Sequence, residues 1–120
     1  MKTMQLTDIE TAVINTFVHY DTKYLDVLDP TEIYSHNYKD EIIAELQREI
    51  DKLILEYPDG LYVKDSVCMF CYPGFNAYSF YSKFSNEFVM RYVIARDEGQ
   101  YRIEPCTNHP IPDGKDGLPF

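Results

Sequence analysis

The chain has 120 residues, 45% of them hydrophobic and 26% charged, which is the composition of a single ordinary globular domain. This composition excludes disordered, collagen-like and repeat architectures. Twenty acidic residues against eleven basic ones leave a formal net charge of −9, which repels phosphate backbones and anionic membrane surfaces. We therefore expect neither nucleic acid nor a membrane surface as a partner.

The beginning of the chain carries one lysine and then Asp8 and Glu10, with no continuous apolar segment after them. This is not the pattern of a secretory signal, and no window approaches the roughly twenty apolar residues that cross a bilayer. Three cysteines, an odd number, favour reduced thiols over a disulfide framework. These features predict a cytoplasmic protein.

Residues 7–28 have helical periodicity. Thr7 and Glu10 have the spacing of a capping box, which predicts that a helix begins there. Apolar residues then recur at steps of three and four, so we expect one bent helix or two short ones broken near Asp21. Pro30 disfavours a helical conformation at the residue before it and ends this segment.

The clearest helix of the sequence follows the polar residues 31–37. Asn37 is suited to cap it, and the turn residues 57–60 stop it. Its apolar face is expected to consist of Tyr38, Ile42, Leu46, Ile50, Leu53 and Tyr57, widened by Ile43 and Ile54. On the opposite face, charged residues three apart can pair across one turn: Glu45 with Arg48, and Glu49 with Lys52.

From Leu61 onward the period changes to two, and aromatic and β-branched residues become frequent. We expect strands at 61–72 (one strand or two short ones), 77–84, 88–96 and 101–104. The short connections between the last three predict antiparallel hairpins. The sequence therefore predicts an α+β fold, in which amino-terminal helices pack on one face of a carboxy-terminal antiparallel sheet of about four strands. Residues 1–109 would form the domain, and 110–120 an irregular tail.

The strand predicted at 88–96 is apolar on both faces. Alternation places Phe88, Met90, Tyr92 and Ile94 on one face, and Val89, Arg91, Val93 and Ala95 on the other. Helices would cover one face. The other would be covered by a partner or by curling of the sheet.

The sharpest pattern of reactive side chains combines Cys68 and Cys71 with Cys106 and His109. Two pairs, each separated by two residues, supply three thiolates and one imidazole, a ligand set that structural zinc accepts. Against zinc, residues three apart on a regular strand point to opposite faces, so Cys68 and Cys71 could not share an ion. The alternative is buried free thiols that act as small apolar side chains. Strand-like flanks also argue against a redox pair, which works at a helix amino terminus.

Aromatic residues gather around the turn at 73–74. They are Tyr72, Phe75, Tyr78, Phe80 and Tyr81. Such residues can form a ligand pocket or the centre of a protein interface. The alternative is that they only line the sheet, because aromatic residues are common in strands.

The order of these elements, helices first with the longest last and then antiparallel strands, is similar to the cone-shaped α+β fold of the nuclear-transport-factor-like and SnoaL-like families. The similarity covers residues 7–106 and is one of topology, without a shared sequence motif. It implies a small domain that often dimerises through its open sheet face and uses the cone interior for ligand binding or acid/base catalysis. Residues 31–37 leave little room for the strand pair that precedes the long helix in those families, and no catalytic residue can be matched.

The sequence contains no complete catalytic motif, and this favours a non-catalytic cytoplasmic binding or protein-interaction domain. Its partner would be an unknown protein or small molecule, or a second copy bound through the sheet. Two alternatives stay open. One is a small ligand-binding or acid/base enzyme with His19 or His36 near its pocket. The other is a structural zinc module that uses the cysteines and His109.

Overall fold

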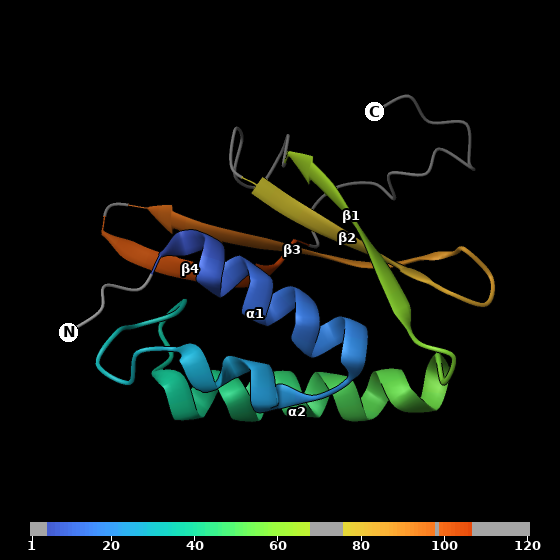
Figure 1. Cartoon of the computed structure of the whole chain (residues 1–120), viewed down its shortest axis with the longest axis horizontal. Coiled ribbons are helices and arrows are strands. Elements are labelled where there is room, and N and C mark those ends of the chain that lie inside the picture. Colours follow the sequence, from blue (N-terminus) through green and yellow to red (C-terminus); the bar gives the residue numbers. More distant parts are fainter. Residues whose placement is uncertain (1–4, 68–75, 98, 107–120) are drawn as a thin grey trace.

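The computed structural model of the chain describes residues 5–67, 76–97 and 99–106. The elements, in chain order, are α1 (Leu6–His19), a 3-10 helix (Thr22–Val27), α2 (Lys39–Glu56), β1 (Leu61–Val67), β2 (Asn76–Ser82), β3 (Phe88–Asp97) and β4 (Gln100–Pro105). Figure 1 shows both α-helices on the same side of the sheet. The α+β fold class, with amino-terminal helices packed on a carboxy-terminal antiparallel sheet, is confirmed.

The four strands lie in the order β1-β2-β3-β4, and each pairs with the next in antiparallel orientation. The short connections predict the antiparallel pairings β2–β3 and β3–β4, whereas they do not predict the order of all four strands. One irregularity interrupts it: Phe80 of β2 pairs with Met90, whereas the following Tyr81 pairs with Phe88. Val89 is thus an extra residue on β3, as in a β-bulge.

The bulge changes which face the first residues of β3 occupy. Val89 and Met90 both pack against the main core, while Phe88 lies beside Tyr81 with a ring-centroid distance of 5.8 Å. The predicted alternation was therefore wrong for Phe88 and Val89, because an extra residue reverses the two-residue period. Beyond the bulge it is correct.

The main core lies between the helices and one face of the sheet. Its fully buried members include Ile9, Val13 and Phe17 of α1, Ile42, Leu46 and Ile50 of α2, and Phe80, Ile94 and Ile103 of the strands. The Phe17 ring contacts those of Phe80 and Tyr92, with centroid distances of 5.3 and 4.9 Å. The apolar stripes of both helices thus face the sheet, as their periodicity predicts.

A smaller buried cluster lies on the opposite face, which we call the outer face of the sheet. It consists of Ala77, Val93, Ala95 and Cys106, each no more than 7% exposed. The second half of β3 therefore has two buried apolar faces, as its sequence predicts.

The helix ends differ in detail from the sequence prediction. The cap of α1 is Gln5, whose backbone N–H donates to the Asp8 carboxylate at 3.1 Å, so the expected pair of Thr7 and Glu10 is not the capping pair. The break near Asp21 is confirmed, because the Asp21 carboxylate accepts from the Lys23 backbone N–H at 2.9 Å and caps the 3-10 helix.

Helix α2 begins at Lys39, one residue later than a cap at Asn37 predicts. Tyr38, not Asn37, is the capping residue, and its backbone N–H donates to the Glu41 carboxylate at 2.8 Å. Tyr38 is 53% exposed and Ile54 is 42% exposed, so neither belongs to the buried stripe. The predicted Glu49–Lys52 pair is present, with a separation of 3.7 Å.

The polar segment before α2 is tied to the edge of the sheet. Tyr34 forms an isolated bridge with Tyr101 of β4, and the two rings stack at 5.6 Å. The Ser35 hydroxyl accepts from the Ile103 backbone N–H at 2.9 Å and donates to Glu104 at 2.8 Å. These contacts fix the start of α2 against β4. None of the helices in the described part of the chain is long and apolar enough to span a membrane.

Candidate functional site

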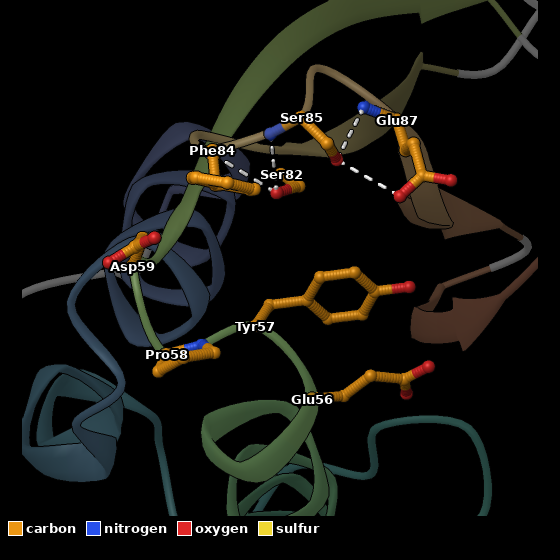
Figure 2. Close-up of a pocket in the computed structure, with 8 residues that line it drawn as sticks. All are labelled: Glu56, Tyr57, Pro58, Asp59, Ser82, Phe84, Ser85 and Glu87. Carbon is orange, nitrogen blue, oxygen red and sulfur yellow. Dashed lines mark hydrogen bonds between the residues drawn. The ribbon is translucent and has the colours of Figure 1, made fainter.

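A pocket of about 340 Å³ lies where the end of α2 faces the hairpin between β2 and β3. One wall comes from the turn after α2 and the other from the hairpin (Figure 2). The lining residues are Glu56, Tyr57, Pro58, Asp59, Ser82, Phe84, Ser85 and Glu87.

The two walls are joined by backbone contacts. Pro58 cannot continue α2, and Gly60 adopts a φ of 94°, a conformation that favours glycine and lets the chain turn into β1. The Gly60 carbonyl accepts from the Lys83 backbone N–H at 3.0 Å. This hydrogen bond holds the turn and the hairpin against each other beside the pocket.

The serine hydroxyls of the pocket shape the hairpin. The Ser82 hydroxyl accepts from the backbone N–H groups of Phe84 and Ser85, both at 3.2 Å. The Ser85 hydroxyl donates to the Glu87 carboxylate at 3.0 Å and accepts from the Glu87 backbone N–H at 3.3 Å. Figure 2 shows this network along the hairpin wall. Its hydroxyls therefore hold the loop in place.

Tyr57 lies across the pocket between Glu56 and the hairpin that carries Glu87 (Figure 2). Its carbonyl accepts from the Tyr20 hydroxyl at 2.7 Å, which anchors it to the chain segment after α1. Burial raises the pKa of the Tyr57 phenol, and the negative charges of Glu56 and Glu87 raise it further. The phenol thus stays protonated and can donate a hydrogen bond into the pocket.

The pocket combines negative charge with exposed aromatic surface. Three of its eight lining residues are carboxylates, from Glu56 and Asp59 on one side and Glu87 on the other. Phe84 is 82% exposed. Within the described ranges, no three His, Cys, Asp or Glu side chains are grouped closely enough to hold a metal ion. The carboxylates therefore surround the space instead of converging on one point.

The aromatic residues predicted as ligand or interface residues are divided between the two faces of the sheet. Tyr78 and Phe80 are buried in the main core, at 7% and 0% exposure. Tyr81 lies on the outer face, because successive residues of a strand point to opposite sides. Tyr72 and Phe75 lie outside the described residues.

Tyr81 belongs to a row of three rings across the outer face. It stacks on Tyr62 at 5.5 Å and meets the edge of Phe88 at 5.8 Å. Two cations lie over this row: the Lys64 amine is 4.8 Å from the Tyr81 ring, and the Arg91 guanidinium is 5.6 Å from that of Phe88. These rings are therefore already engaged by the chain's own cations.

Of the four residues predicted to bind zinc, the structure describes Cys106. Its side chain is buried with Ala77, Val93 and Ala95, and its backbone N–H donates to the Arg91 carbonyl at 2.7 Å. Cys68, Cys71 and His109 lie outside the described residues, so zinc binding stays a prediction. Elemental analysis of the protein, beside a Cys106→Ser variant, tests it.

The two histidines proposed as general bases do not line the pocket. His19 is exposed at the end of α1, where its ring stacks on Tyr24 at 5.3 Å. His36 is exposed in the loop before α2, with a φ of 74°. The structure therefore brings neither imidazole to the carboxylates of this site.

The sequence alone does not identify the pocket. It does predict both of its walls as turns, one after α2 and one before β3. What the sequence does not contain is a local signal that residues 56–59 and 82–87 meet, because that contact depends on how α2 packs on the sheet.

No family model, curated protein or solved structure matches this chain. The similarity to the cone-shaped families is therefore limited to the arrangement of amino-terminal helices and a four-stranded antiparallel sheet.

Proposed function

We propose that the chain is a non-catalytic binding domain and that its ligand site is the pocket between α2 and the β2–β3 hairpin. The observation that carries this proposal is the composition of the pocket, in which exposed aromatic surface and carboxylates line the same space. Concave sites with aromatic walls and a few polar groups are typical ligand sites.

The lining residues support binding over catalysis. They include no histidine, cysteine or lysine, so the pocket has neither a thiol or amine nucleophile nor an imidazole base. Its serine hydroxyls are hydrogen-bonded within the hairpin. A site of this kind can hold a ligand without activating a nucleophile.

A homodimer through the sheet has less support than the pocket. The proposal of such a dimer depends on an apolar outer face that needs a partner. Val93 and Ala95 on that face are already 0% and 5% exposed within one chain. By contrast, Phe84 at the pocket is exposed and available for contact.

Nuclear magnetic resonance with the ¹⁵N-labelled protein tests the proposal. A set of small neutral, anionic and cationic aromatic or aliphatic compounds is added, and amide shifts are mapped onto the chain. We expect binders whose shifts cluster at residues 56–59 and 82–87. Phe84→Ala should weaken them, whereas Tyr38→Ala, which removes an exposed aromatic ring at the other end of α2, should not.

Binders that map elsewhere on the chain would contradict the proposed site. So would an equal effect of Phe84→Ala and Tyr38→Ala, because the pocket would then have no special part in binding. Both variants change exposed side chains, so both should fold.

A further inference from the structure

The polarity of α2 adds to the negative charge of the pocket. Glu56 is the last residue of this helix, and the carboxyl end of a helix carries a partial negative charge. Natural helices often place a basic residue in the last turn to balance it, but the last turn of α2 contains none. The helix end, Glu56, Asp59 and Glu87 therefore all favour a positively charged ligand in this pocket.

The aromatic residues of the pocket favour the same kind of ligand. A cation is attracted to the face of an aromatic ring, and Tyr57 and Phe84 both line this space. The chain already uses this interaction elsewhere: Lys64 lies 4.8 Å from the Tyr81 ring and Arg96 lies 4.7 Å from the Tyr101 ring.

The volume of the pocket and the separation of its carboxylates favour an organic cation over a bare metal ion. Carboxylates that cannot converge on one ion can still flank a larger group whose charge is spread over several atoms. A space of about 340 Å³ also exceeds the needs of a metal ion and suits a side chain. Lys83 runs along Gly60 beside the pocket, but it is not among the lining residues.

We infer that this pocket binds a cationic side chain, the guanidinium of arginine or the ammonium of lysine, presented by a partner polypeptide. This inference rests on the proposed function and specifies its ligand. A polypeptide is favoured over a free small cation because apolar side chains stand exposed in the pocket lining, at Phe84, and next to that lining in the sequence, at Leu55. Phe84 is 82% exposed, and Leu55, which directly precedes Glu56, is 86% exposed. They can cover the residues that flank a basic side chain.

Isothermal titration calorimetry at low salt with two matched peptides tests the inference. Both are acetylated, amidated and apolar around one central position, which is arginine in one peptide and citrulline in the other. Citrulline has nearly the shape of arginine and no charge. We expect the arginine peptide to bind at least about tenfold more tightly, and about 0.5 M salt to remove most of that difference. Arginine amide alone should bind more weakly than the peptide.

Variants locate the effect on the chain. Glu56→Gln and Glu87→Gln should each weaken the arginine peptide by about threefold to tenfold and leave the citrulline peptide unchanged. Asp40→Asn makes the same change of charge in the first turn of α2, about 24 Å away along the helix, and should have no effect.

The outcomes separate this inference from the proposed function. If both peptides bind equally and shift residues of the pocket, the preference for a cation is wrong while the binding site stands. If neither peptide nor any compound of another charge class shifts those residues, both are wrong. If Asp40→Asn weakens binding as much as Glu56→Gln, net charge and not the pocket attracts the peptide. If arginine amide binds as tightly as the peptide, the inference that a polypeptide presents the cation is wrong.

Discussion

Tyr34 shows how one side chain closes the loop between the helices. It is fully buried, and its ring stacks on Tyr101. Its hydroxyl accepts from the Asp29 backbone N–H at 2.9 Å and lies 3.2 Å from the Asp29 carbonyl, to which it can donate. Burial is the main cause that raises the pKa of Tyr34 to about 12. Since Pro30 follows Asp29 directly, this contact fixes the turn before α2.

Tyr34→Phe should lower the free energy of unfolding by about 1–2 kcal/mol, because the Asp29 N–H loses its buried acceptor. Urea denaturation measures the change. Tyr38→Phe removes a hydroxyl from a tyrosine that is 53% exposed and serves as the control, with an expected change under about 0.5 kcal/mol. Equal losses for the two variants would contradict the structural role given to the Tyr34 hydroxyl.

Stability should also depend on pH in the alkaline range. Unfolded tyrosines ionise near pH 10, whereas folded Tyr34 keeps its proton to about pH 12. Above pH 10 the native state therefore binds more protons than the unfolded state, and stability falls as pH rises from about 10 to 12. Below pH 10 the contribution of Tyr34 is fully present. Burial raises the pKa of Tyr92 as well, so it adds to the same decline.

The midpoint of thermal unfolding, followed by circular dichroism between pH 9 and 12, checks this expectation. The decline should be smaller in Tyr34→Phe than in the unmodified protein, since one of the responsible groups is gone. An identical decline in both proteins would show that Tyr34 does not keep its proton in the folded state.

At the scale of elements, helix α2 joins the core to the candidate site. Its buried stripe of Ile42, Leu46, Ile50 and Leu53 packs on the sheet, and its last residue, Glu56, lines the pocket. The position of the pocket wall therefore depends on the same contacts that stabilise the fold.

Replacing Leu46 or Ile50 with Ala should cost about 2–5 kcal/mol of unfolding free energy, because both are fully buried and each change leaves a cavity. Leu55→Ala on the same helix provides the control, since Leu55 is 86% exposed, and should cost less than about 0.5 kcal/mol. Chemical denaturation gives all three values. A loss below about 0.5 kcal/mol at both Leu46 and Ile50 would contradict the packing of α2.

The sequence predicts the type and order of these elements because periodicity is a local property. The prediction fails where a local pattern is compatible with two structures. Thr7 and Glu10 have the spacing of a cap, but Gln5 and Asp8 have it too, and the structure uses the second pair. The bulge at Val89 in β3 cannot be predicted from the sequence either, because an uninterrupted run of apolar residues does not indicate the position of a bulge.

For the whole molecule, the candidate site arises from contact between segments far apart in the chain. The turn after α2 meets the β2–β3 hairpin only because β1 and β2 pair and carry the hairpin back to the helix end. The same pairing of β1 and β2 places Tyr78 and Phe80 in the main core. Predicting the site thus requires the complete topology, whereas predicting the fold class requires only local patterns.

A single tryptophan reports whether this pocket selects a positive charge. The chain contains no tryptophan, so Phe84→Trp places the only indole in the protein at the pocket and keeps an aromatic ring there. Its fluorescence is followed while the arginine peptide or the citrulline peptide is added at low salt. We predict a saturable change in emission with the arginine peptide, reversed by salt, and little change with the citrulline peptide at the same concentrations. An equal response to both peptides, or no response to either, would contradict selection of a positive charge by this pocket.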